Sequence, residues 1–237
     1  MKNPIVTMKV KDGKSIKIEL FPNEAPESVK NFISLINKGF YNNTAFWRVE
    51  NNKLIQGGCP ENNGTGVLGY SIKSECLSNE VDNNLKFTRG TLGYGRFEHN
   101  TESCHFFIVT QDTPQLDKNF ASFGRVVDGM DEVDRISKVE TELEVFLHRA
   151  VEKIYIESMT VNTFGIKYDE PTKLLGLSKE ETLSKWNATM EERKKQAIKW
   201  YKNSLCLSDY VCEPLHVAND FVRCSKKFLR SRQNIFI

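Results

Sequence analysis

The sequence predicts a mainly β fold: an antiparallel barrel of short strands with two capping helices, followed by a helical C-terminal appendage. Short segments that alternate apolar and polar residues recur along the first part of the chain, separated by turns rich in glycine and asparagine. Closing such a sheet on itself removes its exposed edges. A change of pattern near Thr163 marks the start of the appendage.

The first elements are a β-hairpin and an amphipathic helix. The Asp12-Gly13 pair joins two alternating segments and is a hairpin signature. Pro26 stands at a first helical position, and apolar residues then recur at helical spacing up to Gly39. In chain order, the sequence predicts strands at 5–10 and 15–20, a helix near 26–37, strands at 45–49, 53–57, 90–94, 105–110 and 122–127, a helix at 130–136, and a strand at 151–161.

The predicted domains are a barrel domain over residues 1–162 and a helical extension over residues 163–237. The run from Ser178 to Glu181 is a capping box, which predicts the start of a helix. A second helix is predicted from Pro214 onward. The apolar residues that mark the two helix faces are Leu183, Trp186, Met190, Ala197 and Tyr201 on the first, and Ala218, Phe221, Val222 and Phe228 on the second.

Composition narrows the class of protein. The chain is 39% hydrophobic and 27% charged, and its N-terminus lacks the apolar core of a signal peptide, so we expect cytoplasmic residence without a membrane span. The six cysteines form no CxxC pair, so we expect reduced thiols, no metal site and no cofactor. From Thr163 onward fourteen basic residues face nine acidic ones, but few aromatic residues interleave with them, so nucleic-acid binding is not favoured.

Several ordered runs resemble the cyclophilin family of peptidyl-prolyl cis-trans isomerases. The runs are APESVKNF (25–32), FWRV (46–49), LIQGG (54–58) with GTG (64–66), RGTLGYG (89–95), SCHFFI (103–108) and LDKNFASFGRVVDGMDEVDRI (116–136). They span roughly residues 4–162 in the family's order. The resemblance implies a closed barrel of eight antiparallel strands. The Asn- and Lys-rich composition and the appended tail are similar to a cyclophilin encoded by a giant DNA virus.

The resemblance also implies a chemistry, which is rotation about an Xaa-Pro peptide bond. Resonance gives this bond a barrier of roughly 18–20 kcal/mol, and no nucleophile or metal is needed to lower it. The reaction needs a donor aimed at the prolyl nitrogen, an apolar slot for the proline ring, and a backbone donor for the preceding carbonyl. By resemblance, Arg48 is the catalytic donor and the Arg96 N–H anchors the carbonyl. Residues implied to support Arg48 or line the slot are Gln56, Leu54, Phe107 and Leu116.

Other positions of the implied substrate site depart from the family pattern. Lys53 replaces an aromatic floor of the slot and Phe120 replaces a histidine that closes it. Gln115 replaces the tryptophan that holds cyclosporin, so we expect weak cyclosporin binding. The remaining departures are His105 in place of a glutamine, and Gly95, Arg96 and Phe97 in place of the small residues of the groove.

These departures leave two functional hypotheses open. The first is a module that binds proline-containing peptides with weak or lost isomerase activity, because a Lys53 ammonium at the slot costs desolvation. The second is a genuinely active isomerase that assists protein folding. For the extension 163–237, packing within the chain and homo-oligomerisation through its apolar helix faces both stay open, because large apolar patches are rarely left bare in monomers.

Overall fold

The computed structural model describes residues 2–144 and 147–205. The chain forms two compact units, residues 1–188 and 189–237, and the helix α3 (Lys179–Leu205) belongs partly to each. The barrel and the start of α3 lie in the first unit, which holds all the features analysed below. The second helix predicted from Pro214 onward lies outside the described residues.

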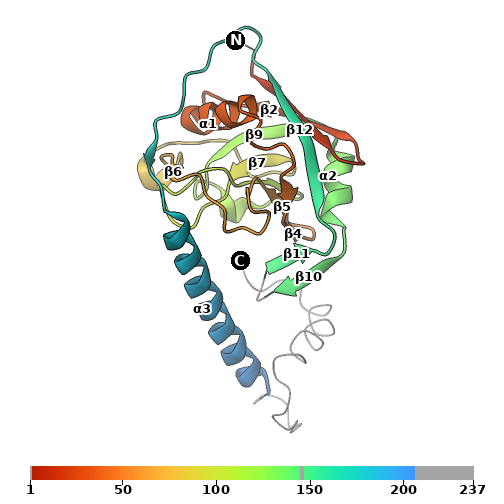
Figure 1. Ribbon diagram of the computed structural model, residues 1–237, viewed down its shortest axis with the longest axis vertical. Coiled ribbons are helices and arrows are strands. Elements are labelled where there is room, and N and C mark those ends of the chain that lie inside the picture. The colour runs from red at the N-terminus through yellow and green to blue at the C-terminus, as the bar shows by residue number, and fades with distance from the viewer. Residues whose placement is uncertain (1, 145–146, 206–237) are drawn as a thin grey trace. The chain divides into compact units, whose positions relative to one another are not determined.

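One antiparallel sheet of nine strands forms the barrel (Figure 1). Its order is β3 (Ala45–Phe46), β12 (Ile154–Asn162), β1 (Ile5–Val10), β2 (Ser15–Leu20), β9 (Ser122–Asp128), β7 (Thr91–Tyr94), β8 (Phe106–Val109), β5 (Leu54–Gly57) and β4 (Arg48–Glu50). Only Trp47 separates β3 from β4, and its N–H donates to the Gln56 carbonyl at 3.0 Å. The two ends of the order are therefore halves of one bent strand. Counted so, the barrel is nearly closed and has eight strands, which confirms the predicted fold class.

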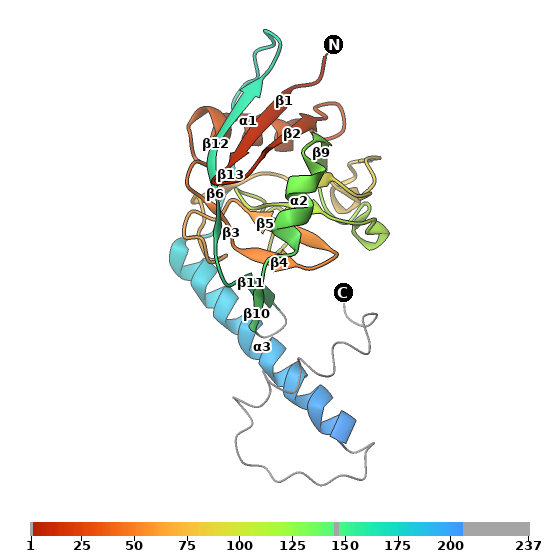
Figure 2. The same cartoon turned by 90° about the vertical axis from the view of Figure 1, so that its right-hand side faces the viewer.

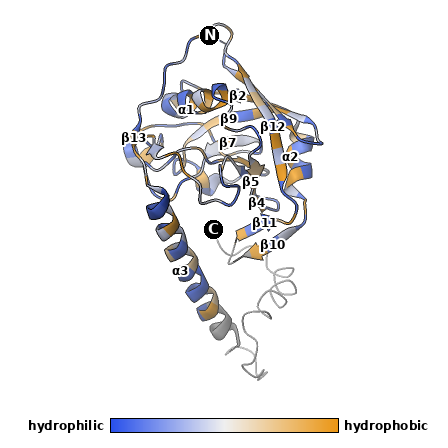
Figure 3. Ribbon diagram, in the orientation of Figure 1, coloured by the Kyte–Doolittle hydropathy of each residue, from blue (hydrophilic) through white to orange (hydrophobic). Residues whose placement is uncertain are grey.

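Side-chain alternation fills the barrel with apolar residues. On β1, Val6, Met8 and Val10 are buried, whereas the residues between them are partly or fully exposed. In Figure 3, hydrophobic and hydrophilic residues likewise both occur along β12. The helices α1 (Pro26–Asn37) and α2 (Met130–Ser137) bury apolar faces against this core, as the helical spacing predicts. The Phe32 ring of α1 contacts four aromatic rings, those of Tyr41, Tyr94, Phe106 and Phe123.

Several short elements are additions to the predicted set. The hairpin of β10 (Thr141–Glu144) and β11 (Leu147–Ala150) packs β11 beside β4 (Figure 2). The sequence prediction placed residues 151–153 in the following strand, whereas β12 begins at Ile154. The other additions are β6 (Tyr70–Ser71), β13 (Leu174–Leu175) and two 3₁₀ helices, η1 (Leu77–Asn79) and η2 (Pro114–Leu116).

The predicted extension begins with a stretch that is not helical. Glu170 accepts a hydrogen bond from Nζ of Lys38, directly after α1, at 2.8 Å, and β13 pairs with β6. α3 then begins at the predicted capping box. The Ser178 N–H donates to Glu181 Oε2 at 2.8 Å, and the Glu181 N–H donates to Ser178 Oγ at 3.1 Å. No helix among the described residues has the length and apolarity needed to cross a bilayer.

Candidate functional site

Three neighbouring strands bring the implied catalytic residues together. Arg48 of β4 is the cross-strand partner of Gln56 on β5, and Gln56 is in turn the partner of Phe107 on β8. Cross-strand partners project from the same face of a sheet. The chain neighbours of Gln56 and Phe107, Ile55 and Ile108, point the other way and belong to the barrel core. Arg48, Gln56 and Phe107 therefore share the outer face of the barrel.

Two acceptors hold the Arg48 guanidinium. One of its terminal nitrogens, Nη1, donates to Gln56 Oε1 at 3.2 Å, and its Nε donates to Glu50 Oε1 at 3.0 Å. The Glu50 side chain is only 15% exposed and also accepts the His148 N–H at 3.4 Å. Sequence reasoning missed Glu50, although two-residue alternation along β4 puts it on the same face as Arg48. The carboxylate both orients the guanidinium and offsets its charge.

The residues that the resemblance implies as the proline slot lie in one apolar cluster. We call four of them, Leu54, Phe107, Leu116 and Phe120, the slot. Leu54 and Phe107 are buried, while Leu116 and Phe120 are partly buried and pack against them. The Phe120 ring meets the Phe107 ring edge-on, with centroids 6.0 Å apart. The Phe107 ring also stacks on the Phe87 ring, with centroids 5.5 Å apart. Phe107 is thereby left only 4% exposed.

Two more of the predicted site residues lie on turns. Lys53 precedes β5, and its N–H donates to the Glu50 carbonyl at 3.0 Å. Its side chain is partly exposed, and its ammonium has no hydrogen-bond or ion-pair partner within the described part of the chain. Gln115 is exposed on η2, where its carbonyl accepts a hydrogen bond from Asn119 Nδ2 at 3.1 Å. Both side chains are thus open to water.

The segment Gly95–Phe97 lies beside Gln56. The Gly95 N–H donates to the His105 carbonyl at 2.8 Å, and a Cβ on Gly95 would lie 2.7 Å from Gln56 Nε2. Glycine at this position therefore keeps Gln56 in place. The Arg96 N–H, the implied anchor for a substrate carbonyl, has no acceptor among the described residues.

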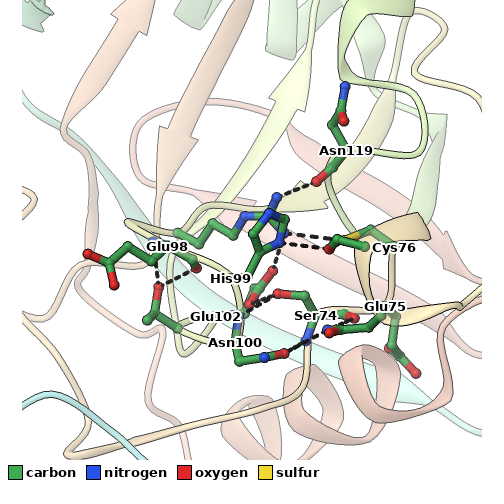
Figure 4. A network of polar contacts seen from close by, with 12 residues as sticks. Ser74, Glu75, Cys76, Glu98, His99, Asn100, Glu102 and Asn119 are labelled. Atoms are coloured by element: carbon green, nitrogen blue, oxygen red, sulfur yellow. Dashed lines mark hydrogen bonds and ion pairs between the residues drawn. The ribbon is translucent and has the colours of Figure 1, made fainter.

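The Arg96 side chain turns inward and is only 8% exposed. It donates to Glu102 Oε1 at 2.9 Å, to Cys76 Sγ at 3.4 Å and to the Asn119 carbonyl, and it lies 4.7 Å above the Phe120 ring. Glu102 is fully buried and also accepts from Ser74 Oγ at 2.5 Å (Figure 4). This ion pair was not predicted, because its partners meet only in the folded chain. It fixes the loop that carries the Arg96 N–H.

Aromatic rings also gather around Trp47, which precedes Arg48 in the chain. Its ring contacts His105 at 5.9 Å and Trp186 of α3 at 6.1 Å, both edge-on. Trp186 also contacts Phe97 edge-on at 6.1 Å. The guanidinium of Arg149 lies 5.7 Å from both the Trp47 and the Trp186 rings. Sequence reasoning placed Trp186 on a helix face but assigned it no partner in the barrel.

A buried thiol shapes the loop beneath these rings. Cys59 Sγ accepts the N–H groups of Gly64 and Gly66 at 3.2 and 3.3 Å, and His105 Nε2 donates to the Gly66 carbonyl at 2.7 Å. Burial raises the pKa of the Cys59 thiol, but hydrogen bonds from His105 and the backbone outweigh burial and lower it to about 7. Among the described residues, no three His, Cys, Asp or Glu side chains are placed to hold a metal ion.

Comparisons with known proteins agree with the barrel. The family model "cyclophilin type peptidyl-prolyl cis-trans isomerase" matches residues 5–161. Peptidyl-prolyl cis-trans isomerase B of Escherichia coli is 40% identical over 169 residues, which cover 67% of this chain and 99% of that protein. Peptidyl-prolyl cis-trans isomerase 9 of Schizosaccharomyces pombe is 36% identical over 167 residues, and this chain spans only 23% of its length. A Cryptosporidium parvum cyclophilin, crystallised in the presence of the dipeptide Ala-Pro, aligns with a TM-score of 0.60 and 26% identity, over 67% of this chain and 99% of that one.

Proposed function

The chain belongs to the cyclophilin-type peptidyl-prolyl cis-trans isomerase family, and on this premise we propose that it binds proline-containing peptide segments with weak or lost isomerase activity. The register that places Arg48, Gln56 and Phe107 on one face carries the proposal. The Ala-Pro dipeptide used with the Cryptosporidium parvum relative supports a prolyl ligand of the same class.

Each part of the proposed site has a physical role. The slot takes the proline ring out of water, and the Arg96 N–H holds the carbonyl that precedes the proline. As rotation breaks the amide resonance, lone-pair density builds up on the prolyl nitrogen. The Arg48 guanidinium, fixed by Gln56, donates a hydrogen bond to that density. Such preorganised donors act most strongly at charge that appears only in the transition state.

Three features support weak turnover. The Glu50 carboxylate pairs with the Arg48 guanidinium and reduces the positive potential that the prolyl nitrogen would meet. The Phe120 ring already lies against Phe107, so a proline ring must displace it to reach the Phe107 ring. The Lys53 ammonium would lose water when a peptide covers it.

A fully active isomerase is the second candidate, and the paired Arg48 and Gln56 beside Phe107 favour it. An NMR exchange assay on an Ala-Pro peptide at high protein concentration separates the two. Under our proposal the peptide binds, and kcat/KM lies at least about tenfold below that of an unmodified family member, which corresponds to about 1.4 kcal/mol of barrier. Turnover at the ordinary family rate would refute the weakened activity, and absence of binding would refute the site.

The other functional expectations stay predictions of the sequence. Weak cyclosporin binding depends on Gln115, which offers neither a large apolar face nor an indole N–H. Homo-oligomerisation through 163–237, a viral origin and cytoplasmic residence are likewise predictions of the sequence. Calorimetry with cyclosporin tests the first of these, since a sub-micromolar Kd would contradict it.

A further inference from the structure

The first turns of α3 lie against the segment Gly95–Phe97. We define the side arm as the surface formed by Trp47, Gly64 and Phe97. Trp186 makes edge-on ring contacts with Trp47 and Phe97, and Gly64 lies beside both indoles. A Cβ on Gly64 would lie 2.7 Å from the Trp47 ring and 3.1 Å from the Trp186 ring. The absence of a side chain there lets the two indoles meet.

The side arm continues directly from the catalytic face. The Trp47 N–H donates to the Gln56 carbonyl, and the Trp47 ring contacts His105, whose carbonyl accepts the Gly95 N–H. A peptide with its proline ring in the slot and the preceding carbonyl on the Arg96 N–H can extend along this segment past Phe97. There it would meet the surface that Trp186 covers.

We propose that Trp186 is an internal occupant of the side arm and restricts the residues that a ligand can carry before its proline. This inference rests on the proposed peptide binding at Arg48 and the slot. A short prolyl ligand reaches the slot with Trp186 in place. A ligand with a longer N-terminal side has to displace Trp186 from Trp47 and Phe97.

The contacts that hold Trp186 permit such displacement. Lys179 pairs with Glu61 and Lys185 pairs with Glu98 at this helix end. Both ion pairs are exposed, and pairs of this kind contribute little to stability. The Trp47 indole N–H is buried, with no acceptor among the described residues. A buried donor without an acceptor is costly. An incoming peptide carbonyl would supply the acceptor that Trp186 does not.

The test measures two ligands on the full chain by NMR titration: the Ala-Pro dipeptide, and an Ala-Pro peptide extended by several residues on its N-terminal side. We expect Trp186→Ala to tighten binding of the extended peptide about tenfold, or about 1.4 kcal/mol. Its affinity for the dipeptide should change by less than about twofold. Leu183→Ala is the matched control, because Leu183 lies on the same helix and is 47% exposed. It should change neither affinity.

The outcomes distinguish a failure of this inference from a failure of the proposed function. Equal affinities of wild type and Trp186→Ala for the extended peptide would overturn the inference and leave the slot proposal standing. An equal gain for both ligands would also overturn it, because Trp186 would then act on the whole site. Binding of neither ligand to any variant would overturn the proposed function and this inference with it. Trp186→Phe guards against misfolding of the alanine variant and should give a smaller gain, about threefold.

Discussion

The slot and the side arm are both aromatic, yet they are built from different parts of the chain. Barrel strands, η2 and the loop after η2 supply every residue of the slot. The side arm also comes from the barrel, but its cover is Trp186 of α3. The slot thus depends on the fold itself, whereas access along the side arm depends on an element added after the fold. Chemistry and access can therefore be altered by separate substitutions.

Removal of Glu102 should have the largest effect, because this residue supports the wall that the two regions share. Glu102→Ala leaves the Arg96 guanidinium buried without its carboxylate, and we expect the free energy of unfolding to fall by about 3 kcal/mol. Urea unfolding measures the change. Glu98→Ala is the matched control, since Glu98 forms an exposed pair with Lys185 and should cost less than about 1 kcal/mol. Equal losses of unfolding free energy in the two variants would show that the buried pair stabilises the fold no more than the exposed one.

Rebuilding the slot should act on turnover alone. The double variant Lys53→Phe with Phe120→His removes the ammonium and the ring that covers Phe107, so kcat/KM should rise about tenfold in the exchange assay. Each single variant should give part of the gain. Arg96 joins the two regions, because its guanidinium lies over the Phe120 ring and its chain neighbour Phe97 belongs to the side arm. With kcat/KM on the extended peptide as the common measure, we expect the gain to add to that of Trp186→Ala. Strong non-additivity would mean that the two regions are coupled.

Substitutions of Glu50 test how the carboxylate next to Arg48 affects turnover. In Glu50→Gln the amide oxygen can still accept the Arg48 Nε–H, but the negative charge is gone. We expect kcat/KM to rise about threefold, less than 1 kcal/mol of barrier. Glu50→Ala loses the orienting bond as well and should lower kcat/KM. If both variants lose activity equally, the charge of Glu50 matters less than its presence.

The smallest effect concerns Glu170, in the non-helical segment that leads to α3. The hydrogen bond from Lys38, with help from Ser34, lowers the pKa of Glu170 from its ordinary value of 4.5 to about 2. The native carboxylate is thus favoured, so its stabilisation is present above pH 4.5 and is lost as the pH falls toward 2. Glu170 is largely exposed, so Glu170→Gln should cost less than about 1 kcal/mol. Unfolding curves of wild type and variant should converge at pH 2; a constant gap would exclude the ion pair as its cause.

Local sequence patterns predicted the elements that local physics determines. The hairpin strands Ile5–Val10 and Ser15–Leu20, α1, and the capping box of α3 match the structure. Glu50 was within reach of the same reasoning, since alternation along β4 puts it beside Arg48. The short hairpin at 141–150 was missed, because its strands are half polar and bear no strong turn signal.

Contacts between distant residues account for the rest. Arg96 and Glu102 belong to one loop, but only the fold buries them together. Trp47 and Trp186 are far apart in the chain, and neither periodicity nor a motif links them. The departures from the family pattern at Phe97 and His105 were the signs in the sequence that this side of the site is altered. Resemblance supplied residue identities at the slot, while the structure supplied their partners.

The bent strand at Trp47 also has a consequence for the order of folding. β3 pairs with β12, so the sheet closes only when residues 154–155 reach Ala45 and Phe46. Contacts so distant in sequence slow folding, and a chain on the ribosome cannot make them before β12 has emerged. α3 emerges later still. A nascent barrel therefore spends an interval closed but uncovered, and during that interval the side arm is open to any peptide nearby, including other parts of the same nascent chain.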